Sequence, residues 1–204
     1  MKRIEGWENI KENSGFEKLS PGGYIVKLLN IQDVPEKEYL KISFDIDEGE
    51  KKGFFTEQYK NNTQTDKKWP NAGSFIRSYK ATAASMFRGF TNAVENSNKG
   101  YTFDFNEESL KGKKVGVIVA EEEYVNQKGQ VRVRTYVSAV RSVDTIKKGE
   151  FTVPELKKLN ITKTTNQPPN DFVNLFANDT TAASEPTNNA VVDDSPFGDF
   201  DPFQ

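Results

Sequence analysis

Residues 39–47 alternate strictly between apolar and polar side chains, and this pattern constrains the fold more than any other part of the chain. A two-residue period places successive side chains on opposite faces of a strand, so one face of this segment belongs to a core. The same alternation recurs over residues 114–124 and 131–143, where valines dominate one face. We therefore expect antiparallel strands that each bury one side. The residues expected in the core are Leu40, Ile42, Phe44, Ile46, Val115, Val117, Val119, Val131, Val133, Thr135 and Val137.

Two further strands are expected before the first helix. Residues 22–31 follow a Pro21-Gly22-Gly23 turn and are predicted to form the first strand, ahead of the strand at 39–47. Residues 54–60 follow a charged, glycine-containing turn and are predicted to form the third strand.

One long helix is expected from Ser74 to about Glu95, because apolar residues recur there at spacings of three and four. Asn126-Gln127-Lys128-Gly129 predicts a hairpin turn between the last two strands. A short final helix is expected over residues 153–159, with Thr152 as its N-cap and Pro154 in its first turn. The apolar stripe of the long helix comprises Phe75, Ile76, Tyr79, Ala83, Met86, Phe87, Phe90 and Val94.

Five strands with a helix between the third and fourth predict a mainly β fold with one long helix. This is the order of the OB-fold, a five-stranded Greek-key barrel that binds oligonucleotides on one face. Another small antiparallel sheet with a packing helix fits the same order.

The composition changes after Asn160 and divides the chain in two. Residues 161–204 hold one basic and seven acidic side chains, a net charge of −6, whereas residues 1–160 hold 27 basic and 23 acidic ones, a net of +4. Five of the nine prolines lie in the second part, which has no apolar periodicity. We therefore expect a folded domain over 1–160 and a flexible acidic tail over 161–204.

The absence of cysteine and histidine excludes much catalytic chemistry. There is no thiolate nucleophile, no imidazole base, no disulfide and no zinc site of the usual type. No phosphate-binding Gly-x-x-x-x-Gly-Lys-Ser/Thr motif occurs either. We expect a protein without catalytic residues, cofactor or metal. No apolar run approaches the roughly 20 residues of a membrane span, and the start lacks a signal-peptide core, so we expect a cytoplasmic protein without a membrane partner.

Clustered carboxylates offer one alternative, a metal-dependent nuclease. Residues 121–123 and 45–48 are rich in acids, and Asp144 with Glu155-Leu156-Lys157 loosely matches the Asp, Glu-x-Lys spacing of some nucleases. Short acidic runs are common in a chain this charged, so a solvated surface explains them as well.

A basic and aromatic strand face is the main candidate binding site. If valines of the last strand point inward, Arg132, Arg134 and Tyr136 are neighbours on the other face, with Lys128 in the preceding turn. Cations for successive phosphates and a ring for a base are what single-stranded DNA requires. A solvated strand face, core packing of Tyr59 and capping of a helix by Trp69 are the structural alternatives. The remaining candidates are Tyr39, Lys41, Tyr59, Lys60, Lys67, Lys68 and Trp69.

The last twelve residues, Asp-Asp-Ser-Pro-Phe-Gly-Asp-Phe-Asp-Pro-Phe-Gln, combine four acids with three phenylalanines and no base. An aromatic tip on a flexible stalk suits capture by an apolar pocket with a basic rim. The predicted partner-binding residues are Asp193, Asp194, Pro196, Phe197, Asp199, Phe200, Asp201, Pro202 and Phe203.

This tip resembles the acidic C-terminal tip of single-stranded DNA-binding proteins of bacteria and their phages. The match falls on Asp193-Asp194 with Pro196-Phe197, and again on Asp201-Pro202-Phe203, whereas Gln204 departs from the family's usual terminal Phe. The body is similar to phage-encoded single-stranded DNA-binding proteins of Gram-positive hosts, through residues 110–117, Glu122-Glu123-Tyr124 and 129–134.

The resemblance implies a non-enzymatic protein that binds and protects single-stranded DNA during phage replication and recombination. Its tail is implied to recruit replication or recombination proteins such as a helicase, primase, polymerase or recombinase. A strand-annealing protein is a further alternative, because it would also bind single strands. Whether the chain forms a homo-oligomer is left open by the sequence.

Overall fold

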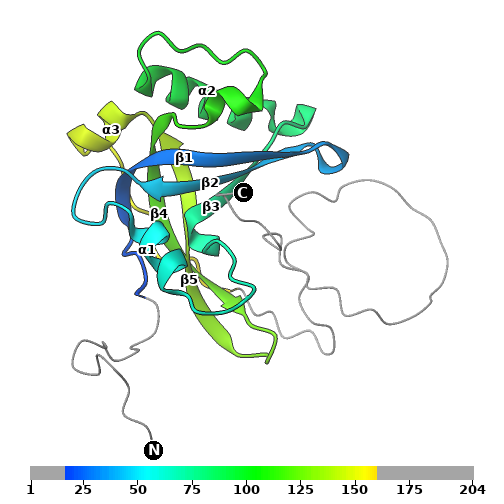
Figure 1. Cartoon of the computed structure of the whole chain (residues 1–204), viewed down its shortest axis with the longest axis vertical. Helices are drawn as coiled ribbons and strands as arrows, with labels where there is room; N and C mark the ends of the chain where they lie inside the picture. The colour runs from blue at the N-terminus through cyan, green and yellow to red at the C-terminus, as the bar shows by residue number, and fades with distance from the viewer. Residues whose placement is uncertain (1–16, 160–204) are drawn as a thin grey trace, which may run out of the picture.

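Five antiparallel strands form the sheet on which the fold is built (Figure 1). The structure is a computed structural model that describes residues 17–159. In the sheet the strands follow the order β3-β2-β1-β4-β5, so β3 and β5 are its two edges. The strands are β1 (Gly22–Val34), β2 (Tyr39–Ile46), β3 (Ser74–Ser78), β4 (Lys114–Val125) and β5 (Val131–Arg141).

Three α-helices accompany the strands in the described part of the chain, with α2 and α1 at opposite ends of the sheet (Figure 1). Short 3-10 turns η2 (Pro35–Lys37), η3 (Asn71–Gly73), η4 (Ala81–Ala83) and η5 (Glu107–Leu110) lie in the connections. The mainly β architecture is thus confirmed. The α-helices are α1 (Phe54–Asn61), α2 (Ala84–Ser97) and α3 (Val143–Lys148).

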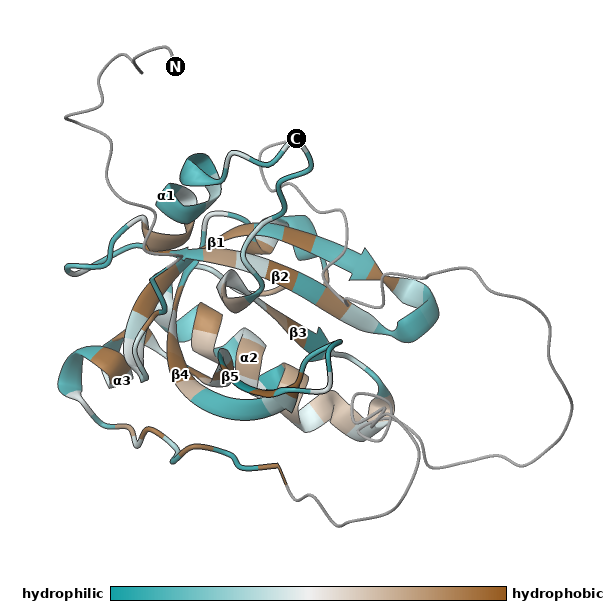
Figure 2. Cartoon of the chain, turned by 90° about the horizontal axis from the view of Figure 1, so that it is seen from below, coloured by the Kyte–Doolittle hydropathy of each residue, from teal (hydrophilic) through white to brown (hydrophobic). Residues whose placement is uncertain are grey.

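The core is aromatic where β2, β3 and the helices meet. The Phe44 ring of β2 lies 5.5 Å from Phe55 of α1 and 5.7 Å from Phe75 of β3, and Phe75 lies 6.0 Å from Phe90 of α2. Burying each such ring contributes about 1.5–3 kcal/mol. The alternation that predicts β2 is visible as bands of contrasting hydropathy along the ribbons (Figure 2).

The prediction of a strand over residues 54–60 is wrong, because these residues form α1. Phe55 and Tyr59 are four residues apart, a spacing that fits one face of a strand and one face of a helix equally well. The Asp45 carboxylate of β2 decides for the helix, since it accepts hydrogen bonds from the backbone N–H groups of Phe55 (2.9 Å) and Thr56 (3.0 Å). These are donors that a helix N-terminus leaves without an intrahelical partner.

The long helix predicted from Ser74 to about Glu95 is also partly wrong. Its first five residues form β3, which pairs with β2, and the Ser74 and Ser43 hydroxyls lie 3.0 Å apart across that pairing. The helix begins only at Ala84 and ends at Ser97. Met86, expected on the apolar stripe, is 67% exposed. The order of three strands, a helix and two strands survives, with β3 as the third strand.

Residues 153–159 do not form the predicted final helix. The helix α3 comes earlier, capped by the Ser142 side chain, which accepts from Thr145 N, and closed by Gly149 in the left-handed region at φ 69°. Lys157 instead lies beside β4, where its N–H donates to Glu121 O (3.0 Å) and its carbonyl accepts from Glu123 N (2.9 Å). β1 pairs with β4 only as far as Val119, so β4 has an open edge there for this segment.

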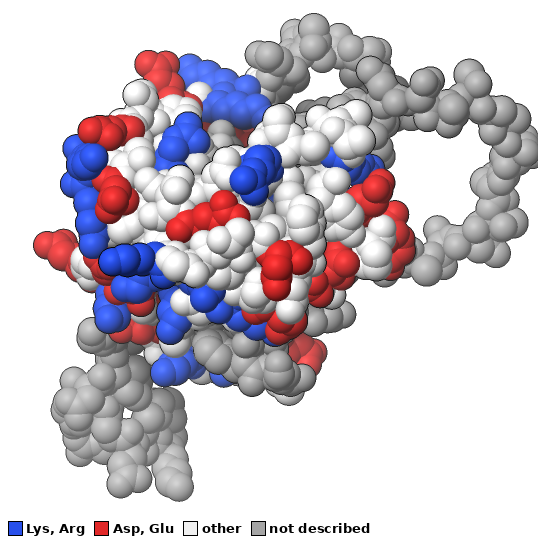
Figure 3. Space-filling model, turned by 90° about the horizontal axis from the view of Figure 1, so that it is seen from above, with Lys and Arg blue, Asp and Glu red and all other residues white. Residues whose placement is uncertain are grey.

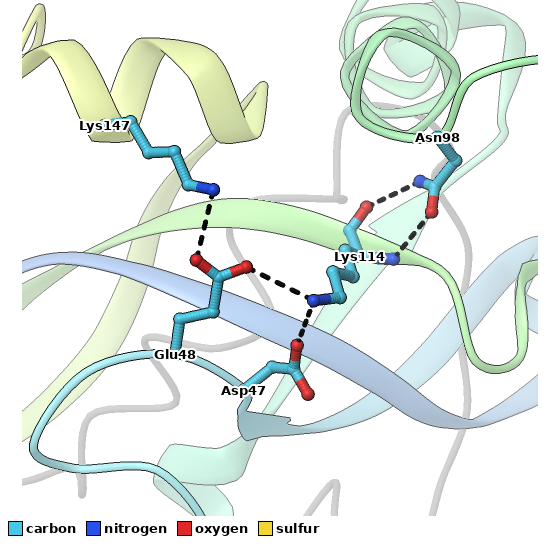
Figure 4. Close-up of polar contacts among 5 residues, drawn as sticks. All are labelled: Asp47, Glu48, Asn98, Lys114 and Lys147. Atoms are coloured by element: carbon cyan, nitrogen blue, oxygen red, sulfur yellow. Dashed lines mark hydrogen bonds and ion pairs between the residues drawn. The ribbon is translucent and has the colours of Figure 1, made fainter.

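A polar network centred on Lys114 joins the start of β4 to the ends of β2 and α2 (Figure 4). The Lys114 Nζ lies 2.5 Å from a carboxylate oxygen of Asp47 and 3.2 Å from one of Glu48. The Nζ of Lys147, on α3, lies 3.2 Å from the other carboxylate oxygen of Glu48. Asn98, just after α2, accepts from Lys114 N (3.0 Å) and donates to Lys114 O (2.8 Å). The network fixes both helices against the sheet at one place.

The predicted tail over 161–204 and its tip at 193–204 lie outside the described residues. The division into a domain of residues 1–160 and a tail therefore stays a prediction. Within residues 17–159, no helix has both the length and the apolar character that crossing a membrane requires.

Candidate nucleic-acid interface

The β4–β5 hairpin projects beyond the rest of the sheet. Asn126 closes its turn by accepting from the N–H groups of Lys128 (3.0 Å) and Gln130 (2.9 Å), which confirms the hairpin expected there. β1 stops pairing at Val119, so the hairpin beyond that residue has no β1 beside it. For this reason Val131, predicted to face the core, is 47% exposed.

Arg132, Arg134 and Tyr136 share one face of this hairpin. The register between β4 and β5 runs without a bulge from Val131 to Val137, so alternate residues of β5 point the same way. Tyr124 lies opposite Arg132 on β4, and Glu122 lies opposite Arg134. We call Lys128, Arg132, Arg134, Tyr136 and Tyr124 the hairpin face.

Arg134 is held by two neighbours on that face. Its Nε donates to Glu122 Oε1 at 2.8 Å, and its Nη2 lies 2.8 Å from the same oxygen. Its guanidinium also lies over the Tyr124 ring, 5.0 Å from the centroid, as in a cation–π contact. Arg134 is therefore pre-oriented, but a phosphate that approaches it has to compete with the Glu122 carboxylate.

Arg132 and Tyr136 flank this pair along β5. Arg132 is exposed and donates through Nη2 to Gln130 Oε1 at 3.1 Å. Tyr136 is half-buried; burial and then the Glu122 charge raise the pKa of its hydroxyl, so this group is a neutral donor at physiological pH. Lys128 is exposed at the turn. The hairpin face therefore offers cations and two rings within one surface.

The structure contradicts the prediction that Trp69 stacks on a base, because this side chain is only 3% exposed. Its Nε1 donates to Gly73 O at 3.0 Å, and its ring lies 5.8 Å from the Tyr59 ring, which is also buried in the core. Neither ring can receive a base without leaving the core. Tyr59 therefore packs in the core, which was the structural alternative to a DNA contact.

The other predicted residues divide into buried and surface positions. Lys41 is 5% exposed, so its ammonium is not presented to solvent as a phosphate contact requires. Tyr39, two residues earlier on β2, is half-buried. Lys60 is exposed on the last turn of α1, and Lys67 lies over the Tyr59 ring at 4.7 Å.

The connection from α1 to β3 approaches β5 through its η3 turn. This turn contacts β2 as well. Lys67 and Lys68, both half-buried, lie in this connection just before Trp69. Lys67 and Lys68 thus lie on a connection whose η3 turn borders β5, and Lys60 lies before that connection on the last turn of α1.

The acidic clusters have structural partners. Asp45 caps α1, Asp47 binds Lys114, Glu122 binds Arg134, and Glu123 accepts from Leu159 N at 3.1 Å. Over residues 17–159 no group of three or more carboxylates, or other common ligand side chains, is arranged to hold a metal ion.

No protein-family model matches the chain, and no curated protein is significantly similar to it. The hairpin face is therefore the feature from which a function can be inferred. That face combines guanidinium groups, which suit phosphates, with aromatic rings, which suit bases.

Glu122 and Tyr124 are the neighbours of Arg134 that the sequence argument did not use. The turn between β4 and β5 fixes which residues of the two strands lie opposite, because pairing proceeds outward from the turn one residue at a time. In the structure Val125 pairs with Val131, which leaves residues 126–130 between the paired positions and places Glu122 across from Arg134. Counting outward from a turn at residues 126–129 places Glu122 across from Val133 instead, so the sequence did not predict the ion pair.

Proposed function

We propose that this chain binds single-stranded DNA, without strong sequence preference, on the hairpin face. In this proposal it is a non-enzymatic protein of the phage-infected host cytoplasm that protects exposed strands during DNA replication and recombination. Its acidic tail recruits other proteins of those processes.

The topology supports an OB-fold as the framework. The strand order β3-β2-β1-β4-β5, with α2 between β3 and β4, is that of a five-stranded Greek-key barrel opened between β3 and β5. Residues of the two edge strands also approach each other, as closing a barrel requires. In such folds the loops and strands around one face bind oligonucleotides.

The single observation that carries the proposal is the arrangement of Arg132, Arg134, Tyr124 and Tyr136 on one face of the projecting hairpin. Guanidinium groups bind phosphates whatever the base, and every base has a face on which a ring can stack. Such contacts give affinity with little sequence readout. The net charge of +4 over residues 1–160 favours the same ligand.

The recruiting role rests on the sequence of the tail. Its tip carries three phenylalanines and four acids, which suit an apolar pocket with a basic rim on another protein. The acids of the tip are repelled by the phosphates of DNA. In this proposal the tip therefore binds another protein, and the hairpin face binds the DNA.

Fluorescence anisotropy with labelled oligo-dT, measured at low and at physiological salt, tests the proposal. We expect binding that weakens as salt rises, and weaker binding of duplex DNA of the same length. Arg132→Ala should reduce affinity, whereas Lys148→Ala, which removes an exposed lysine from α3 at the other end of β4, should change it little. Absence of binding at low salt, or equal affinity for duplex, would overturn the proposal.

The same protein preparation separates the other candidate functions. Labelled DNA incubated with Mg²⁺ or Mn²⁺ should stay intact, since fragments would indicate a nuclease. Complementary oligonucleotides should not pair faster with the protein than without it, since faster pairing would indicate a strand-annealing protein.

A further inference from the structure

An apolar cavity of about 570 Å³ lies between the far end of β1, the helix α2 and the segment that follows α2. Four aromatic side chains, Tyr79, Phe87, Phe103 and Phe105, line it, and Leu40 of β2 also contributes. We call these four rings the aromatic cup. The rings of Phe87 and Phe103 lie 5.9 Å apart and those of Phe103 and Phe105 lie 5.5 Å apart, so they form one continuous surface.

Phe105 occupies a position that folding alone does not explain. Its side chain is 87% exposed, so its ring gains little from burial. Its backbone has φ 64°, the left-handed region that a bulky residue enters only at a cost of about 1–3 kcal/mol. A residue that is both strained and exposed beside a cavity is placed to contact a ligand.

The charges around the aromatic cup are mainly acidic. Asp33 and Glu107 line the cavity, and Tyr79 donates to Asp33 Oδ1 at 2.8 Å. Arg88, the one cation among the lining residues, lies 3.8 Å from Glu95. Figure 3, which looks down on this side, shows a largely uncharged surface on which basic and acidic side chains are interspersed, with acidic ones gathered along its right edge. Further charged residues on the neighbouring turns are Glu36, Lys37, Glu38, Lys80, Asp104, Glu108 and Lys111, of which the last two pair with each other.

This acidic rim determines which ligands suit the cup. It repels the phosphates of a nucleic acid and also repels the chain's own tip at residues 193–204, with its four acids. It attracts a ligand that carries lysine or arginine next to an apolar group. The cavity volume lies within the range of small-ligand sites and accommodates one large side chain.

We propose that the aromatic cup is a docking site for a peptide segment of another protein that presents one large apolar side chain flanked by lysine or arginine. The anchor fills the cavity against Phe87, Phe103 and Phe105, and the flanking cations meet Asp33 and Glu107. In Figure 1 the α2 end of the sheet lies opposite the tip of the β4–β5 hairpin, so peptide and DNA bind at separate places. The site does not depend on the proposed DNA binding.

The test uses the full chain and three fluorescein-labelled peptides in an anisotropy titration. The peptides are Gly-Lys-Lys-Leu-Phe-Lys-Lys-Gly, its acidic counterpart with Glu at every Lys, and a version with Ser-Ser in place of Leu-Phe. We expect the first to bind and the other two to bind at least about tenfold more weakly. Equal binding of the acidic peptide would overturn the proposed charge complementarity, and equal binding of the Ser-Ser peptide would overturn the anchor.

Phe105→Asn separates binding from folding. Asparagine enters the left-handed region more readily than phenylalanine, so the melting temperature should stay the same or rise. Peptide affinity should fall about tenfold, since the exposed ring is lost. Met86→Ser is the matched control, because Met86 is an exposed apolar residue of α2 that does not line the cavity.

Asp33→Asn combined with Glu107→Gln tests the rim. The variant should bind the cationic peptide more weakly and with a smaller salt dependence. Unchanged binding in Phe105→Asn, or an equal loss in Met86→Ser, would overturn the proposal. If Phe105→Asn instead abolishes self-association of the chain and no peptide binds, the cup is an interface between copies and the proposal is wrong.

Discussion

Arg134 and Glu122 face each other across the β4–β5 hairpin, with the guanidinium Nε and Nη2 both 2.8 Å from one carboxylate oxygen. The pair orients the cation over Tyr124 and at the same time offsets its charge. Lys157 lies 3.8 Å from the other oxygen of Glu122, so the carboxylate is shared. Glu122 therefore offsets the charge that Arg134 contributes to the hairpin face.

Glu122→Gln should strengthen binding of oligo-dT at low salt. The amide oxygen can still accept a hydrogen bond from Arg134, but the competing negative charge is gone. An exposed or half-exposed ion pair is worth about 0.2–1 kcal/mol, so the gain should be up to about fivefold. Glu150→Gln removes the same charge from an exposed position beyond α3 and controls for net charge. An equal gain in both variants would show that Glu122 has no local role.

Tyr136→Ala should weaken binding of single strands by about 1–3 kcal/mol, the usual effect of losing one stacking ring. Tyr136→Phe keeps the ring and should keep most of the affinity. Anisotropy titrations of both variants, after their melting temperatures have been compared with that of the parent chain, check this. If the phenylalanine variant loses as much as the alanine variant, the hydroxyl rather than the ring makes the contact.

The sequence predicted those strands whose neighbours are fixed by local pattern. β2, β4 and β5 each alternate along their own length, and the turn at residues 126–129 joins the last two. The α1 segment was mispredicted because Phe55 and Tyr59 fit either period, and the deciding contact comes from Asp45, a residue of β2. A contact with a distant strand leaves no periodic signal within the segment itself.

The candidate site likewise contains residues that local pattern places and residues that only distant contacts place. Alternation of side chains along β5 is enough to place Arg132, Arg134 and Tyr136 on one face, and the structure shows them on one face. Burial of Trp69 depends on how η3 folds back so that Gly73 approaches the indole, and no local pattern encodes that return. The aromatic cup was not predicted, because its rings come from the segment before α2, from α2 itself and from the segment after it, where Phe105 has a left-handed conformation.

Asp45→Ala should destabilise the fold strongly, because the carboxylate accepts from Ile46 N, Phe55 N and Thr56 N in a buried position. Removing a cap that also leaves buried donors without an acceptor costs about 1–3 kcal/mol. Urea denaturation followed by circular dichroism gives the free energy of unfolding. Asp66→Ala, at an exposed position in the connection after α1, should change it little. Similar losses in both variants would mean that Asp45 does not cap α1.

Replacing Lys114 by Met should lower the melting temperature at neutral pH by a few degrees, and the difference from the parent chain should disappear in acid. The hydrogen bond from Lys114 lowers the pKa of Asp47, and hydrogen bonds from Lys147 and Lys114 lower that of Glu48. A carboxyl group whose pKa is lower in the folded state stabilises the fold above its ordinary pKa of about 4, and this contribution is lost as the pH falls through the folded value. Thermal melts of the two proteins at neutral pH and in steps below about pH 4 measure the effect. Lys148→Met, which changes an exposed lysine of α3, should melt like the parent chain throughout. A Lys114→Met difference that persists at the lowest pH would show that the side chain stabilises the fold by packing and not through these carboxylates.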